Sequence, residues 1–271
     1  MRRVAEIPQM GYGTWQRKGV ACFRGVIDAL DVGYRHIDTA EAYNNEDFIG
    51  TALAESGLQR DEVWVTTKVA PEHFGPGQVR GHVEASLEKL RLDRVDLLLL
   101  HYPAINDEYA MEDYIAQFVE VREAGLTRHL GVSNFTIRHI DRALELLGDV
   151  PILTNQVELH PFLANRPIVE HCRARGIPLT AYSPLARGRV TRDPVLAEIA
   201  GAHGASAAQV TLAWLMAEGH AVLPSSVSRA HIAEDFAAQE LALTDAELER
   251  IRGLDRGERL IDGPWCPEWD R

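Results

Sequence analysis

The chain has 271 residues, of which 46% are hydrophobic and 25% charged, and its formal net charge at pH 7 is −12. This acidic balance argues against nucleic-acid binding, which favours a basic face, and no apolar run approaches the ~20 residues that cross a bilayer. The first residues include no apolar signal segment, and the three cysteines, Cys22, Cys172 and Cys266, lie far apart in the sequence. We therefore expect a single cytoplasmic domain over residues 1–271, without a disulfide framework or a cysteine-based zinc site.

Segments typical of strands and of helices alternate along the chain. Runs of β-branched and aliphatic residues predict strands at residues 34–38, 63–67, 95–100, 129–132, 152–157, 178–182 and 221–223. Between these runs, apolar residues spaced three and four apart predict helices at residues 21–30, 46–55, 78–90, 111–123, 137–147 and 207–216. Glycines stand where several helices are expected to end, as left-handed C-terminal capping favours: Gly33, Gly57, Gly125, Gly148, Gly176 and Gly219.

Repeated alternation of strand and helix predicts parallel strands joined by right-handed crossovers. A doubly wound dinucleotide-binding sheet is the alternative, and it would carry GxGxxG after its first strand. The N-terminal glycines read Gly11-Tyr12-Gly13, with no third glycine at that spacing. We predict an α/β fold of the (β/α)8 TIM-barrel type, with functional side chains at the C-terminal ends of the strands. The tail, about residues 257–271, is expected near the barrel mouth.

Four polar residues stand at or just beyond the ends of predicted strands: Asp38, Tyr43, Lys68 and His101. Taken singly, each has a structural explanation as a helix cap, a packed ring, a solvated amine or a satisfied histidine. Taken together, they supply what proton transfer needs. A phenol with a pKa of about 10 is a poor acid at neutral pH, and a neighbouring ammonium lowers that pKa. A carboxylate holds the ammonium charged, and an imidazole hydrogen-bonds the substrate, so the set predicts proton donation to a carbonyl oxygen.

Five motifs in order resemble those of the aldo-keto reductase superfamily. They are the segments at residues 33–43, 95–101, 131–135, 155–158 and 181–185. The similarity runs from about Gly11 to Asp270. Within the superfamily the chain looks most similar to bacterial 2,5-diketo-D-gluconate reductases of the B type, through Leu223-Pro224-Ser225-Ser226 and the Pro-Glu-Trp-Asp ending.

The resemblance implies a role for each motif residue. Tyr43 is expected to be the general acid of reduction, with Lys68 tuning it and Asp38 pairing with Lys68, while His101 orients the carbonyl. The nicotinamide ring is expected to stack on Tyr182. The full expected cofactor set is Gly13, Thr14, Trp15, Asp38, Ser133, Asn134, Gln156, Tyr182, Ser183, Pro184, Leu185, Ser225, Ser226, Arg229, His231, Glu234 and Asp235; Ser133, Asn134 and Gln156 hold the carboxamide.

The adenosine end departs from the family pattern. Many relatives carry Lys-Ser-x-x-x-x-Arg after the eighth strand, and the two cations clamp the 2′-phosphate of NADPH. Here Ser225 and His231 take those positions, and Arg229 is offered as a substitute. Glu234 is expected at the adenine, and Asp235 stands where relatives usually have Asn. We expect NADP(H) to be favoured, with appreciable use of NAD(H), because charge-assisted contacts to the phosphate are lost.

The expected substrate pocket is wider than in many relatives, because Ala70 and Tyr102 each stand where a Trp is common. Its expected lining is Trp15, Tyr43, Phe74, His101, Tyr102 and Trp265, with Trp269 as a further tail residue. The expected activity is reversible NAD(P)H-dependent reduction of aldehydes or ketones, such as α-dicarbonyls or keto sugars. The partner is expected to be a small-molecule carbonyl compound, with no nucleic acid or membrane, and the protein to be a monomer or weak homo-oligomer.

Two other functions fit parts of this pattern. A non-enzymatic, nucleotide-binding relative keeps the fold, but the intact Asp38, Tyr43, Lys68 and His101 argue against it. A metal-dependent barrel hydrolase needs a His-x-His pair or several carboxylates at strand ends. His36 precedes Asp38, but no second metal-ligand cluster is visible in the sequence, so no metal site is predicted.

Overall fold

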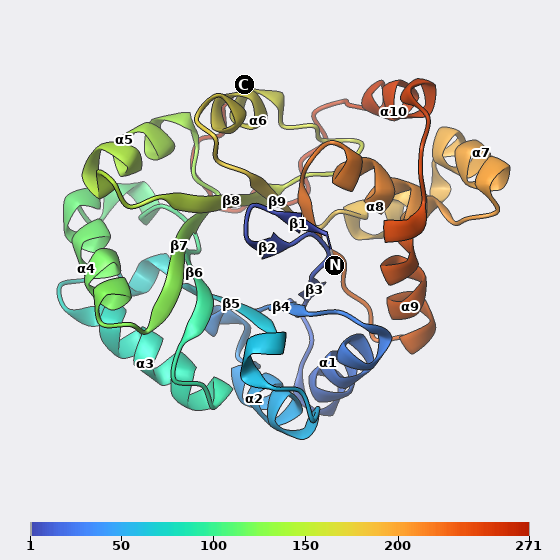
Figure 1. The fold of residues 1–271 in the computed structure, drawn as a ribbon. Coiled ribbons are helices and arrows are strands. Elements are labelled where there is room, and N and C mark those ends of the chain that lie inside the picture. Colours follow the sequence, from blue (N-terminus) through green and yellow to red (C-terminus); the bar gives the residue numbers. More distant parts are fainter. Residues whose placement is uncertain (1, 271) are drawn as a thin grey trace.

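Eight parallel strands form a ring that is surrounded by helices in the computed structural model, which describes residues 2–270 (Figure 1). In chain order the strands are β3 (Tyr12–Gly13), β4 (His36–Asp38), β5 (Trp64–Val69), β6 (Val95–Leu100), β7 (Thr127–Ser133), β8 (Ile152–Glu158), β9 (Leu179–Tyr182) and β10 (Ala221–Leu223). A parallel bridge between Met10 and Val222 brings the first strand against the last, and Gly11 N donates to Val222 O at 2.9 Å. The predicted TIM barrel is therefore confirmed.

The helices cover the outside of the ring. They are α1 (Gly19–Val32), α2 (Glu46–Glu55), α3 (Gln78–Leu90), α4 (Met111–Glu123), α5 (Ile137–Leu147), α6 (Arg166–Ala174), α7 (Pro194–His203), α8 (Ala207–Ala217), α9 (Arg229–Ala237) and α10 (Asp245–Arg252). The apolar stripe of α3 shows why: Val79, Val83 and Leu87 are all buried. The six glycines expected at helix ends all adopt positive φ angles, where a residue with a side chain is strained.

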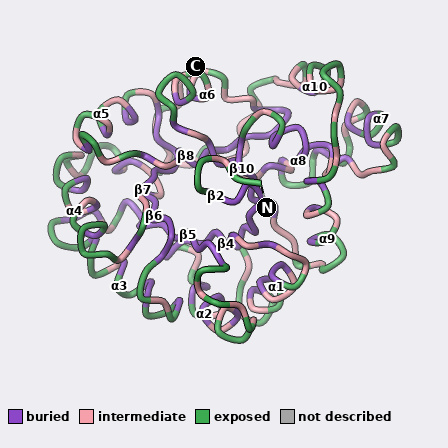
Figure 2. The backbone as a smooth tube through the Cα atoms, in the orientation of Figure 1, coloured by how far each residue is buried: buried purple, intermediate pink, exposed green. Residues whose placement is uncertain are grey.

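Strand β6 shows how the two layers of the core are built. Leu97 and Leu99 point into the barrel, where they meet Ile7 and Trp64, while Leu98 and Leu100 join the larger core between strands and helices. This alternation follows from the two-residue period of a strand. The result is a buried inner ring with exposed outer helix faces (Figure 2).

A hairpin that the sequence analysis did not predict precedes the barrel. Its strands are β1 (Arg3–Val4) and β2 (Ile7–Pro8), and Figure 1 shows it near the barrel axis. Ile7 joins the interior cluster, and the side chain of Gln9 donates to Met216 O at 2.8 Å. The hairpin therefore covers the N-terminal end of the strands and leaves their C-terminal ends to form the site.

Over residues 2–270, none of the helices is both long and apolar enough to cross a membrane. The thiols of Cys22, Cys172 and Cys266 are free, and the first two are buried.

Candidate active site

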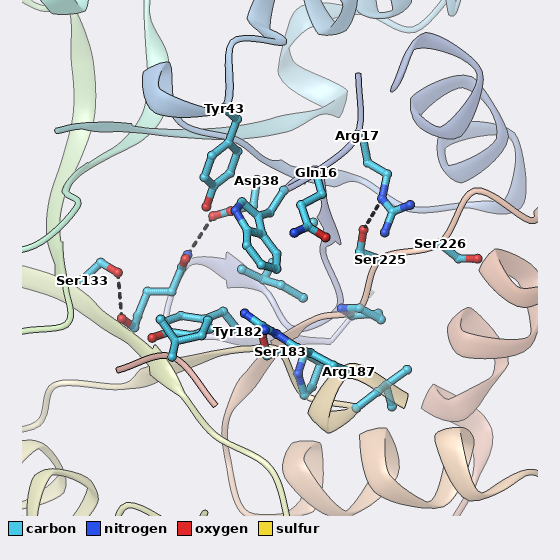
Figure 3. Close-up of a pocket in the computed structure, with 18 of the residues that line it drawn as sticks. Gln16, Arg17, Asp38, Tyr43, Ser133, Tyr182, Ser183, Arg187, Ser225 and Ser226 are labelled. Carbon is cyan, nitrogen blue, oxygen red and sulfur yellow. Dashed lines mark hydrogen bonds between the residues drawn. The ribbon is translucent and has the colours of Figure 1, made fainter. Parts of the chain in front are cut away.

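A cavity of about 880 Å³ opens at the C-terminal ends of the strands (Figure 3). Asp38, Tyr43 and His101 line one part of it, and Ser225 and Ser226 line another. The close-up shows Tyr43 and Asp38 near one another, well away from Ser226. The cavity is therefore continuous between the residues predicted for chemistry and those predicted for the adenosine end.

A buried ion pair lies beneath Tyr43. Lys68 Nζ donates to Asp38 Oδ1 at 2.6 Å and to Thr39 O at 2.7 Å, and it lies 3.5 Å from the Tyr43 hydroxyl. The strand register explains this: Asp38 pairs with Thr66, and Lys68, two residues further along β5, shares the same face. Gln156 Nε2 donates to the other Asp38 oxygen at 2.7 Å, so both carboxylate oxygens are held.

The protonation state of Tyr43 differs from the sequence-based expectation. Burial raises the pKa of Tyr43 well above 10, and the nearby Asp38 carboxylate raises this pKa further. The expected lowering by Lys68 is absent because Lys68 lies closer to Asp38, which offsets its charge. The phenol is therefore protonated at neutral pH, as a proton donor must be, and its raised pKa makes it a weaker acid than the sequence-based expectation required.

His101 is a neutral neighbour of this phenol. Burial lowers the pKa of His101 to about 3, and the positive charge of Lys68 makes a smaller contribution in the same direction. Its ring meets the Tyr43 ring edge to face, with centroids 5.6 Å apart. His101 can thus hydrogen-bond a substrate oxygen as a neutral imidazole, and Tyr43 remains the stronger candidate for proton donation.

A hydrogen-bonded wall of the cavity is formed by the side chains of Ser133, Asn134 and Tyr182 together with the backbone of Gln156. Asn134, with a φ of 61° in the left-handed region that Asn tolerates, donates to Ser133 Oγ at 3.0 Å and accepts from the Tyr182 hydroxyl at 2.8 Å. Ser133 in turn donates to the backbone oxygen of Gln156 at 2.9 Å. One N–H of the Gln156 amide is used on Asp38, and an amide carries a second N–H and an oxygen for a ligand.

Two arginines that the sequence analysis missed reach the cavity. Arg17 lines it and donates through Nε to Ser225 Oγ at 3.0 Å, which Figure 3 marks with a dashed line. Arg187 also lines it, with its guanidinium 5.1 Å from the Trp15 ring centroid. Arg17 lies in the loop before α1, and Arg187 lies in the short helix η5 (Ala186–Arg192). The fold brings both to the cavity, so spacing along the sequence gave no signal for them.

Of the residues predicted for the adenosine end, five lie in the same lining: Ser225, Ser226, His231, Glu234 and Asp235. Asp235 is buried. This burial raises its pKa to about 7, and the negative charge of Glu234 makes a smaller contribution in the same direction. This end therefore combines the cationic Arg17 with two acidic groups.

The comparisons with known proteins agree with this geometry. Residues 9–256 match the Aldo/keto reductase family. The chain belongs to the aldo/keto reductase family. It is 42% identical to methylglyoxal reductase DkgB of Escherichia coli O157:H7 over 265 residues, covering 97% of this chain and 99% of that one. It is 38% identical to an aldo-keto reductase of Mycobacterium sp. (strain KMS), covering 95% and 93%.

Solved structures of the family superpose closely on this reductase. A putative 2,5-diketo-D-gluconic acid reductase B matches with a TM-score of 0.94 and 41% identity, covering 98% of this chain and 95% of that one. The aldose reductase of Schistosoma japonicum matches with a TM-score of 0.89 and 32% identity, covering 94% and 91%. The protein is thus an oxidoreductase that reduces carbonyl groups with a nicotinamide cofactor, and the non-enzymatic alternative is not favoured.

Most of the predicted substrate-pocket residues of this reductase line the cavity: Trp15, Tyr43, His101, Tyr102 and Trp265. Phe74 does not, because its side chain is fully buried and stacks on Tyr114 with centroids 4.6 Å apart. Trp269 is also placed elsewhere, since its indole N–H donates to Asp262 at 2.9 Å and the Arg259 guanidinium lies over its ring.

The predicted cofactor residues show a similar division. Gly13, Asp38, Ser183, Pro184 and Leu185 line the cavity. Thr14 lies behind the wall, fully buried, with its hydroxyl donating to Asp38 O at 2.9 Å. Arg229 lies outside the lining, because its guanidinium pairs with Asp28 at 2.6 Å and Asp31 at 3.2 Å. The structure therefore gives Arg17, and not Arg229, the position near Ser225.

The C-terminal tail of this reductase reaches the cavity through one buried anchor. The Glu158 carboxylate accepts the backbone N–H groups of Leu260 at 2.8 Å and Ile261 at 3.0 Å. Ile261 and Trp265 then line the cavity. At the far end, the Asp270 carboxylate accepts the N–H of Ile137 at 2.9 Å, at the start of α5.

Proposed function

We propose that this reductase converts small α-dicarbonyls or keto sugars to alcohols with NADPH, and that Tyr43 gives the proton. The observation that supports this most directly is the position of the Tyr43 hydroxyl at the cavity wall. It lies 3.5 Å from Nζ of Lys68, which is paired with Asp38, and the Tyr43 ring meets the His101 ring edge to face. When bound, the nicotinamide cofactor supplies the hydride. The reaction is reversible, with Tyr43 as base in the oxidation direction.

Each side chain has one task in this proposal. His101 hydrogen-bonds the carbonyl oxygen and orients it. As negative charge develops on that oxygen, the Tyr43 hydroxyl donates its proton to it. The ammonium of Lys68 then stabilises the phenolate that remains, and Asp38 holds Lys68 in place. The wall of Ser133, Asn134 and Gln156 is proposed to hold the carboxamide of the cofactor, with Tyr182 as the stacking surface.

The donor set at the other end of the cavity fits a phosphorylated dinucleotide. Arg17 and Arg187 bring positive charge to the lining, and Ser225 and Ser226 bring hydroxyl groups. The acidic groups of Glu234 and Asp235 act in the other direction, because negative charge repels a 2′-phosphate. We propose that NADP(H) is favoured through Arg17, in the role first expected for Arg229, and that NAD(H) is also used.

The proposed substrate class rests on the shape of the mouth and on relatives. Ala70 leaves room where many relatives carry an indole, and Trp15, Tyr102 and Trp265 give apolar surface around a small carbonyl compound. The similar proteins are a methylglyoxal reductase and a putative 2,5-diketo-D-gluconic acid reductase. We propose that the protein acts as a monomer or a weak homo-oligomer.

Oxidation of NADPH and NADH at 340 nm in the presence of methylglyoxal, 2,5-diketo-D-gluconate or an aromatic aldehyde tests the proposal. We expect turnover of at least one dicarbonyl, with kcat/KM higher for NADPH than for NADH by less than about a thousandfold, or about 4 kcal/mol. Tight cofactor binding without turnover of any of these compounds would contradict the proposed substrate class.

A further inference from the structure

Three residues far apart in the sequence meet beside the cavity mouth. Glu41 comes from the short helix η1 (Glu41–Tyr43), His73 from η3 (Pro71–His73) and His82 from α3. Nδ1 of His73 lies 2.8 Å from Glu41 Oε1, and Nδ1 of His82 lies 2.8 Å from Glu41 Oε2. One potential ligand atom from each residue lies within 4.8 Å of the other two.

The two imidazoles have an unusual relation to each other. Their rings are stacked, with centroids 3.5 Å apart and an interplanar angle of 13°, and both turn Nδ1 toward the same carboxylate. Each Nδ1 lies at hydrogen-bond distance from the carboxylate. A cation between the rings and the carboxylate would be bound by the Nδ1 lone pair of each ring and by one carboxylate oxygen.

The carboxylate of Glu41 is held in a fixed position. Its side chain is 8% exposed, and Oε1 accepts the backbone N–H of Ala70 at 2.6 Å. The side chains of His73 and His82 are 36% and 35% exposed, so an ion can reach them from solvent. The two imidazoles and the carboxylate can therefore contact an ion directly, while the backbone N–H of Ala70 holds the carboxylate in position.

From this geometry we propose that Glu41, His73 and His82 bind one divalent transition-metal ion of the zinc class. Two imidazole nitrogens and one carboxylate oxygen form a known zinc ligand set that leaves a fourth position for water. Magnesium and calcium prefer oxygen ligands and do not match it. Bonds of about 2.0 Å put tetrahedral donors about 3.3 Å apart, so binding needs the rings to tilt and each N–O separation to widen by about 0.5 Å.

The site goes beyond the proposed carbonyl reduction, which uses no metal. It is nevertheless next to the reaction site, since Glu41 shares η1 with Tyr43, and Pro71 and Glu72 line the cavity just before His73. A bound ion would tie η1, η3 and α3 together at the mouth. Its role is that of a brace, and it stabilises the folded state by ligand linkage.

Calorimetric titration of Zn²⁺ into untagged protein, previously treated with a chelator and then freed of it, tests the proposal. We expect one site per chain with a micromolar or lower Kd. His73→Gln and His82→Gln are each expected to raise that Kd at least tenfold. His203→Gln is the matched control, because His203 pairs with Glu247 at 2.8 Å as a single histidine on α7, and it should leave the Kd unchanged.

A second measurement needs no variant. Co²⁺ added to the wild-type chain should give the visible absorption of a four-coordinate site, and Zn²⁺ should abolish it. Zinc should also raise the Tm of wild type and of His203→Gln, but not that of His73→Gln. Absence of stoichiometric zinc binding by the wild type, or an unchanged Kd in both His73→Gln and His82→Gln, would overturn the proposal.

Discussion

At the scale of single residues, the buried pair of Lys68 and Asp38 gives the most direct test by mutation. Both side chains are almost fully buried and 2.6 Å apart. Lys68→Met leaves the Asp38 charge buried without its cation, so we expect the free energy of unfolding to fall by about 3–5 kcal/mol. Urea denaturation measures this. The double variant Asp38→Asn/Lys68→Met should regain part of the loss, and a Lys68→Met variant as stable as wild type would refute the argument.

Variants of Arg17 and Arg229 distinguish a specific effect on cofactor preference from a general effect of removing positive charge. Arg17→Ala removes a cation that lines the cavity and hydrogen-bonds Ser225, so kcat/KM with NADPH should fall about tenfold, the cost of one charge-assisted contact, with little change for NADH. Arg229→Ala is the control, because Arg229 is already paired with Asp28 and Asp31. Steady-state kinetics with both cofactors decide this. A shift in cofactor preference in Arg229→Ala alone would reverse the assignment.

The sequence predicted the chemical residues better than it predicted their surroundings. Asp38, Tyr43, Lys68 and His101 follow strands and carry distinctive motifs, so their convergence could be expected from the barrel topology alone. Arg17 could not be found in this way, because only long-range folding brings it to Ser225. The lowered pKa expected for Tyr43 was wrong, since burial and Asp38 outweigh Lys68.

At the scale of elements, the C-terminal tail depends on Glu158 at the end of β8. Its carboxylate accepts two tail N–H groups, one on each oxygen, and Glu158→Gln replaces one of these acceptors with a donor that opposes the N–H facing it. We expect a loss of about 1–3 kcal/mol in unfolding free energy and faster hydrogen exchange at residues 258–270. Because Ile261 and Trp265 line the cavity, KM for the carbonyl substrate should rise more than kcat falls. Unchanged exchange in the tail would contradict the role of this anchor.

Element boundaries were predictable where the pattern is strong. The helices at residues 46–55, 78–90, 111–123 and 137–147 and the strands at 95–100 and 221–223 match the structure. The hairpin β1–β2 was not predicted, because strands of two residues show no periodicity. Phe74 was misplaced because its position after β5 suggested the mouth, while its ring packs beneath α4 on Tyr114.

At the scale of the whole molecule, one buried acid should make stability depend on pH. The pKa of Asp235 is raised to about 7, so the folded protein keeps this proton while the unfolded chain loses it above about pH 4. Stability is therefore lost as pH rises from about 4 to about 7. Asp235→Asn removes this loss and should be more stable than wild type by up to about 4 kcal/mol at pH 8, with no advantage at pH 4.

Urea unfolding of wild type and Asp235→Asn across this pH range measures the effect. Glu234→Gln is a useful companion variant, because removing that charge should lower the pKa of Asp235 and shrink the pH dependence. A difference between Asp235→Asn and wild type that stays constant from pH 4 to pH 8 would show that burial does not shift this group.

The barrel holds the Tyr43 hydroxyl beside Lys68 and Asp38 at the cavity wall, and we propose that catalysis depends on this arrangement. The most direct test is Tyr43→Phe, assayed for NADPH oxidation with saturating carbonyl substrate and for cofactor binding by fluorescence titration. We predict that kcat falls by about 10²–10⁴, the usual contribution of general acid catalysis, while the Kd for NADPH stays within about twofold of wild type. A Tyr43→Phe enzyme that keeps a kcat within about threefold of wild type would contradict the account.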